Sequence, residues 1–117
     1  MSENSMFIDF FGDYPLIKVL DFLVENNVFD YSKKEICRQT GVSWNTLELF
    51  WPKLEKDQLI VFTRKVGKAS LFKLNSNSLI AKQLIELDNL LIKQSLGKIQ
   101  PKRKLVLLVQ AGSARKK

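Results

Sequence analysis

The sequence predicts a mainly α-helical fold with a small β-hairpin, and three observations lead to this prediction. First, apolar residues recur at three- and four-residue intervals in residues 16–26 and 79–96, which is the spacing of amphipathic helices. Second, two shorter helical segments lie between them and are separated by Gly41, a residue suited to a helix end. Third, two extended apolar runs, 59–63 and 69–74, flank a basic turn that contains a glycine.

The N-terminal part of the chain predicts a helix and then a short strand. Residues 1–11 end in an apolar, aromatic stretch and are expected to form an N-terminal cover without an assigned structure. Pro15 suits the first turn of a helix, because its missing N–H group would have no partner there. The first helix is therefore expected to run from Pro15 to about Asn26. Residues 28–31 follow, and we expect them to add a short strand that pairs with the hairpin.

Two shorter helices are bounded by capping residues. Ser32 and Glu35 have the spacing of a capping box, in which a hydroxyl and a carboxylate satisfy free amide groups of the first turn. This helix is expected to stop at Gly41, and Ser43 then caps a second helix that runs to about Asp57. Its inward side is expected to consist of apolar residues at helical spacing: Leu47, Phe50 or Trp51, and Leu54.

Two helices joined by a glycine-containing turn and followed by a charged hairpin make a winged helix-turn-helix, whose second helix is shaped to enter the major groove of DNA. We therefore expect a sequence-specific regulator of transcription that binds double-stranded DNA. The first turns of the second helix would contact base edges, and basic side chains beside it and on the hairpin would contact phosphates. The candidate DNA contacts are Ser43, Trp44, Asn45, Glu48, Lys53, Lys33, Lys34, Arg64, Lys65 and Lys68.

The last helical segment has a wider apolar surface than one small domain needs to cover. Four of its apolar residues alternate by four, three and four positions, the repeat of a heptad seam: Ile80, Leu84, Leu87 and Leu91. Either this helix folds back on its own domain, or the seam pairs with a second copy to form a homodimer. Apolar residues on more than one face favour the homodimer. The chain thus divides into a cover (1–11), a winged helix-turn-helix domain (12–76), a dimerisation helix (77–96) and a basic tail (97–117).

The net charge of +7 hides a polarity along the chain. Residues 1–31 carry six acids and one base, whereas residues 32–76 carry nine bases and four acids. Residues 97–117 carry seven bases and no acid, and this tail is either solvated or a flexible arm on DNA phosphates. The basic helix-turn-helix and hairpin, rather than the overall charge, are what indicate a nucleic-acid partner.

Composition argues against several other classes. One cysteine and no histidine exclude an intramolecular disulfide and the usual zinc sites, so no metal and no cofactor are expected. Cys37 is expected to be a packing residue, and a reducing cytoplasm fits its presence. No apolar run approaches the roughly 18–20 residues of a membrane span, so no membrane association is expected. Without a histidine base, a glycine-rich phosphate loop or an activated nucleophile, an enzyme is not expected.

One resemblance rests on six segments of the chain: residues 11–23, 29–32, 41–44, 51–55, 73–75 and 84–88. Together they resemble a group of small archaeal winged-helix proteins, which look like transcriptional regulators of the broad MarR/ArsR type. The resemblance implies a DNA-binding protein that is dimeric or able to dimerise. Glu48 and Leu49 depart from the group, which places basic or imidazole side chains there, and the Cys/His clusters of metal-sensing relatives are missing.

Two other functions compete with the DNA-binding prediction. Winged helices also serve as protein-docking modules, and the fold alone does not decide between these uses. Glu48, Leu49 and an exposed Trp44 would suit a docking surface. An antitoxin-like protein, which binds DNA and a partner protein together, lies between the two.

Overall fold

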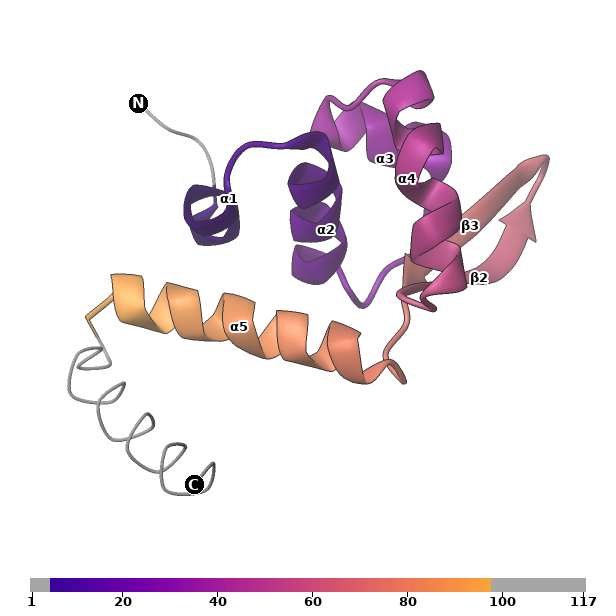
Figure 1. Ribbon diagram of the computed structural model, residues 1–117. Helices are drawn as coiled ribbons and strands as arrows, with labels where there is room; N and C mark the ends of the chain where they lie inside the picture. The colour runs from indigo at the N-terminus through magenta and orange to yellow at the C-terminus, as the bar shows by residue number, and fades with distance from the viewer. Residues whose placement is uncertain (1–4, 98–117) are drawn as a thin grey trace.

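The computed structural model describes residues 5–97 and contains, within them, five helices and a three-stranded antiparallel sheet (Figure 1). The expected helix-rich architecture with a hairpin is confirmed. The predictions for residues 1–4 and for the tail after Gly97 lie outside the described residues. The elements are α1 (Met6–Phe11), α2 (Pro15–Glu25), β1 (Tyr31–Ser32), α3 (Lys33–Thr40), α4 (Trp44–Lys56), β2 (Ile60–Val66), β3 (Ala69–Leu74) and α5 (Leu79–Ser95).

The predicted helix boundaries agree with the structure because the caps act locally. The Ser32 hydroxyl accepts a hydrogen bond from the Glu35 amide at 3.1 Å, and the Ser43 hydroxyl accepts one from the Thr46 amide at 3.1 Å. Gly41 ends α3 in the left-handed region, with φ at 77°. The N-terminal cover is a helix, α1, whose first turn is capped by the Ser5 hydroxyl.

The sheet has the order β1-β3-β2, and its short first strand is the one expected before α3. Tyr31 lies opposite Phe72, so β1 ties the start of α3 to the hairpin formed by β2 and β3. The turn of the hairpin is tighter than the sequence suggested, because Arg64 and Lys65 belong to β2. Gly67, with φ at 61°, allows a two-residue turn between the paired residues at the ends of the strands.

The core lies between α2, α3, α4 and the base of the hairpin. Its fully buried side chains include Val19 and Leu23 of α2, Ile36 of α3 and Leu74 of β3. Trp51, not Phe50, is the fully buried aromatic residue of α4. Its ring packs edge-on against the Phe72 ring at a centroid distance of 5.2 Å. Because α4 packs on the core through this one side, its opposite side is exposed to solvent.

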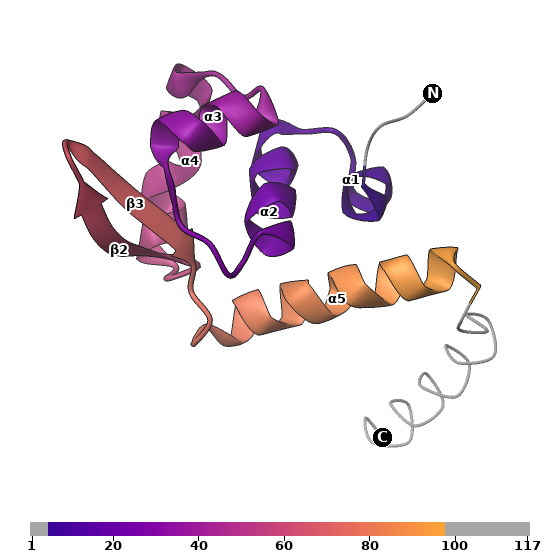
Figure 2. The ribbon, with the colours of Figure 1, turned by 180° about the vertical axis from the view of Figure 1, so that it is seen from behind.

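Helix α5 runs under α1 and α2, away from the tip of the hairpin (Figure 2). Ala81 is fully buried, and Leu84 packs against the core of its own chain. The helix therefore folds back on its own domain along this face. Leu84, one of the four residues expected in the heptad seam, contacts the core because it lies one turn from Ala81 and one turn from Asp88, the two buried residues of α5. Of the other seam residues, Ile80 is exposed, whereas Leu87 and Leu91 are half-buried.

Two aspartates are buried where α5 meets α2. Asp21 is 8% exposed and Asp88 is 6% exposed. Burial raises the pKa of Asp88, and the neighbouring charge of Asp21 raises it further. Burial also raises the pKa of Asp21, although the Ser5 hydroxyl, which donates to its carboxylate at 2.6 Å, acts in the opposite direction. The folded protein therefore holds protons on these groups more tightly than the unfolded chain does.

We expect Asp88→Asn to stabilise the protein at neutral pH by about 1 kcal/mol, a size typical of removing one unfavourable group. Because the folded pKa is raised, wild-type stability falls as pH rises from about 4 through the folded pKa, and the variant escapes this loss. Thermal unfolding between pH 4 and pH 8 should show the difference growing with pH. Glu86→Gln, an exposed change on the same helix, is the control. A gain that is equal at both ends of the range would contradict the explanation.

Candidate nucleic-acid interface

The outward face of α4 is accessible to a large partner. Asn45 is exposed, Trp44 is 48% exposed and Leu49 is 82% exposed. Helical spacing adds Pro52 and Lys56 to the same face as Asn45 and Leu49. Leu49 and Lys56 were not among the candidate contacts predicted from the sequence. The repeat of four, three and four residues from Asn45 could have placed both on this exposed face.

Two candidate residues, Lys33 and Glu48, form an ion pair with each other. The Lys33 ammonium donates to Oε2 of Glu48 at 2.9 Å, joining the start of α3 to the second turn of α4. The same ammonium lies 5.8 Å from the Trp44 ring centroid and 5.3 Å from that of Trp51. Both distances are within the range of a cation–π contact. Neither side chain is therefore an isolated charge in this structure.

Another candidate residue, Arg64, is held by a carboxylate from the segment before β1. Its Nε and Nη2 atoms donate to the two oxygens of Asp30 at 3.0 and 3.2 Å. The Thr63 hydroxyl also donates to Asp30. These hydrogen bonds, that of Arg64 first, lower the pKa of Asp30 to about 2, so the carboxylate stays charged at every physiological pH. The Arg64 charge is balanced within the chain.

The remaining basic candidates differ in their pairing. Lys53 pairs with Asp57 one turn later on α4, at 3.0 Å. In contrast, Lys34, Lys65 and Lys68 are exposed and form no ion pair within the described part of the chain. Among the candidate residues, these three lysines therefore carry positive charges that no carboxylate of the described residues balances.

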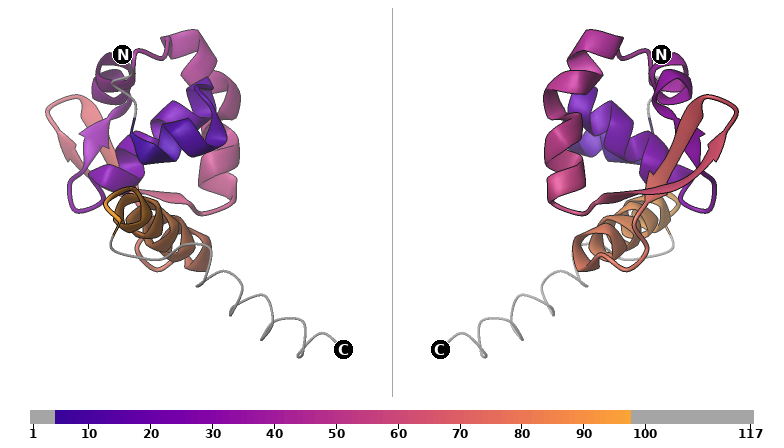
Figure 3. Two further views of the ribbon diagram at one scale, coloured as in Figure 1. Left: turned by 90° about the vertical axis from the view of Figure 1, so that its left-hand side faces the viewer. Right: turned by 90° about the vertical axis from the view of Figure 1, so that its right-hand side faces the viewer.

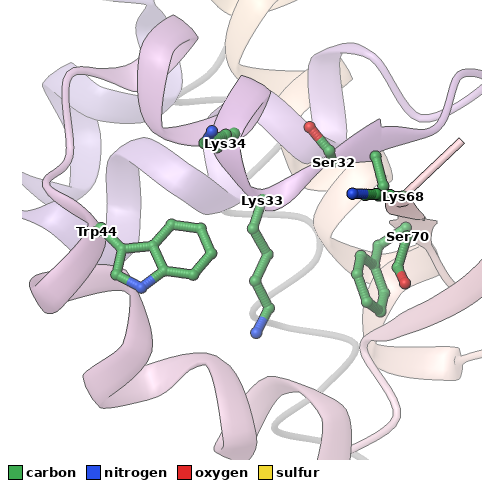
Figure 4. Close-up of a pocket in the computed structure, with 8 residues that line it drawn as sticks. Ser32, Lys33, Lys34, Trp44, Lys68 and Ser70 are labelled. Carbon is green, nitrogen blue, oxygen red and sulfur yellow. The ribbon is translucent and has the colours of Figure 1, made fainter.

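A surface cleft of about 500 Å³ brings several of the candidates together. Figure 4 shows the Lys33 side chain extending beside the Trp44 indole, with Lys68 and Ser70 across the cleft. Figure 3 (right) views the molecule from the hairpin side and shows α4 and the hairpin on opposite sides of the view. The sequence did not point to the remaining lining residues, since strand pairing alone places them here. The lining is Ser32, Lys33, Lys34, Trp44, Lys68, Ala69, Ser70 and Phe72.

The structure separates candidate residues that line the cleft from candidate residues that do not. The cleft brings Lys33, Lys34, Trp44 and Lys68 together, whereas Lys53 and Arg64 do not line it. Ser43 caps α4 and also donates from its hydroxyl to Thr46 at 2.9 Å. Its side chain is thus engaged locally.

A functional proposal for this protein rests on the geometry of α4, the hairpin and the cleft between them. Among the described residues, no helix is long and apolar enough to cross a membrane, and no three side chains of metal-binding type form a group that could hold an ion. No protein-family model, no curated protein and no solved structure matches the chain.

Proposed function

We propose that this protein is a winged helix-turn-helix regulator of transcription that binds double-stranded DNA. The element order from α2 to β3, with β1 paired to the hairpin, is the order expected of that motif. One observation carries the proposal: Trp44, at the start of the exposed α4, and Lys68, in the hairpin turn, line the same cleft. A duplex lying across this face would meet both at once. As a DNA-binding regulator it would act in the cytoplasm.

In this proposal α4 is the recognition helix in the major groove. Asn45 is the residue best suited to an adenine edge, to which its amide can donate and accept together. Leu49, the most exposed apolar residue of α4, suits a thymine methyl group. Trp44 would pack against a sugar or a thymine methyl at the side of the groove.

Phosphate contacts would come mainly from the unpaired lysines 34, 65 and 68. A basic side chain that already pairs with a carboxylate gains less from a phosphate, because it must give up or share the first pairing to make the second. Lys33, Lys53 and Arg64 are in this position. With about three effective contacts, the slope of log affinity against log salt should be near −3 for one bound protomer, from roughly −0.9 per phosphate.

Selection of bound duplexes from a random pool at two salt concentrations tests the function. We expect a defined sequence to be recovered and Asn45→Ala to cost about 1–3 kcal/mol at particular base pairs only. Lys34→Ala serves as the comparison, because loss of a phosphate contact should weaken binding to all sequences alike. Binding that does not respond to salt, or no binding to duplex DNA at all, would refute the proposal.

We also propose a homodimer, in which α5 supplies the contact. Leu79 is 75% exposed and Ile80 is 57% exposed, so the beginning of the helix presents apolar surface to solvent. Because Leu84 is used within its own chain, the seam would centre on Ile80, Leu87 and Leu91. A palindromic sequence recovered from the random pool would agree with two-fold symmetry.

A protein-docking module is the second candidate. Leu49 favours it, since an apolar side chain 82% exposed at the centre of the α4 face suits a protein partner as well as DNA. The Lys33–Glu48 pair also lowers the positive charge of that face. Indifference to duplex DNA at low salt, in the selection described above, would favour this function.

A further inference from the structure

The Lys33–Glu48 pair is an arrangement that simple phosphate binding does not explain. Glu48 lies one turn after Trp44, on the part of α4 that the proposed function places in the groove. A carboxylate there repels phosphates, so its presence weakens binding to any sequence. The structure does not bury this group, because 40% of the Glu48 side chain stays accessible to solvent.

Lys33 is held more firmly than Glu48. Only 25% of its side chain is accessible, and its ammonium lies within cation–π range of both indoles, those of Trp44 and Trp51. Trp51 is itself 1% exposed, which anchors this contact to the core. Lys33 is thus a fixed point from which a neighbouring side chain can be oriented.

The hydrogen bond from Lys33 uses only one of the two carboxylate oxygens of Glu48. The ammonium donates to Oε2, and within the described residues no hydrogen bond is made to Oε1. A carboxylate held by one oxygen has lost much of its rotational freedom and keeps its second oxygen as an acceptor. Among base edges in the major groove, the cytosine amine is a donor that Glu and Asp accept from.

We propose that Glu48 determines sequence specificity by accepting a hydrogen bond from a cytosine amine, and that Lys33 is the positioning residue that aims its carboxylate. Lys33 then acts through Glu48 and not as a phosphate contact. The pair lowers affinity for phosphates in general while favouring one base, which increases the difference between specific and random DNA. This inference rests on the proposed function, since it assumes that α4 lies in the major groove.

The test compares Glu48→Gln with Glu55→Gln, an exposed carboxylate on the same helix whose loss changes the net charge equally. Affinity is measured for the selected duplex, for the same duplex with each cytosine replaced, and for a random duplex of equal length. We expect Glu48→Gln to raise random-duplex affinity about 3-fold and to reduce discrimination at one cytosine about 10-fold. Glu55→Gln should leave that discrimination unchanged.

Lys33→Met tests the positioning role, because methionine keeps an unbranched side chain at this place but loses the ammonium that holds the Glu48 carboxylate. It should also reduce discrimination at that cytosine, and the double variant should discriminate no worse than Glu48→Gln alone. Unchanged cytosine discrimination in Glu48→Gln, or an equal effect of Glu55→Gln, overturns the inference while DNA binding stands. Failure of the wild-type protein to bind any duplex overturns both proposals.

Discussion

Reversing the charge of two hairpin lysines, Lys65→Glu together with Lys68→Glu, should lower affinity for every DNA duplex by about 100-fold. Both residues are exposed and form no ion pair in the described part of the chain, so their charges are available to phosphates. Two lost charge-assisted contacts, at about 1.5 kcal/mol each, correspond to a change of this size. Titration of a labelled duplex at fixed salt measures it, and the slope against log salt should become shallower.

The control is the same change of charge on α5. Lys82 and Lys93 are exposed there, on the helix that runs away from the tip of the hairpin (Figure 1). Lys82→Glu with Lys93→Glu should cost much less than the hairpin variant. If both double variants weakened binding equally, the overall charge and not the hairpin would account for the affinity.

Replacing the buried tryptophan of α4, Trp51→Ala, should destabilise the fold by about 3–5 kcal/mol. Its side chain is 1% exposed, and it packs edge-on against Phe72 while lying beneath the Lys33 ammonium. The substitution would leave a cavity between α4 and the sheet that neighbouring side chains cannot fill. Denaturant unfolding at neutral pH measures the loss, which is a large part of the stability of a domain of this size.

Trp51→Phe separates ring packing from hydrogen bonding. The Nε1 atom of Trp51 is buried and has no hydrogen-bond partner among residues 5–97, so removing the N–H group sacrifices no hydrogen bond there. A phenyl ring keeps much of the contact with Phe72, and we expect this variant to lose less than about 2 kcal/mol. A loss equal to that of Trp51→Ala would contradict this expectation, because it would mean that a phenyl ring cannot replace the packing of the indole at this position.

Local signals allowed the sequence to determine the ends of the helices. A serine hydroxyl at the cap and a glycine at a left-handed position act within three or four residues, so Ser32, Ser43 and Gly41 could be assigned without knowing the fold. The two extended runs on either side of a basic, glycine-containing turn likewise predicted the hairpin. The sequence left Phe50 or Trp51 open as the inward residue of α4, and only packing decided for Trp51.

The charge pairing at the candidate interface depends on contacts between residues distant in sequence. Lys33 and Glu48 are 15 residues apart, and Asp30 and Arg64 are 34 apart, so no local pattern predicts either pair. The sequence could not rank the basic candidates for phosphate contact, which are Lys33, Lys34, Lys53, Arg64, Lys65 and Lys68. The tertiary structure divided them into paired and unpaired charges.

The amino-acid sequence by itself determined where α2, α3, α4 and α5 begin and end and that the middle of the chain is basic. Those properties follow from capping, periodicity and composition, which act over a few residues. Only the tertiary structure decided that Trp44 and Lys68 share a cleft, that Leu84 contacts its own core, and which basic side chains form ion pairs within the described part of the chain. Those outcomes depend on how the helices pack on the sheet, because packing brings together side chains that the sequence keeps apart.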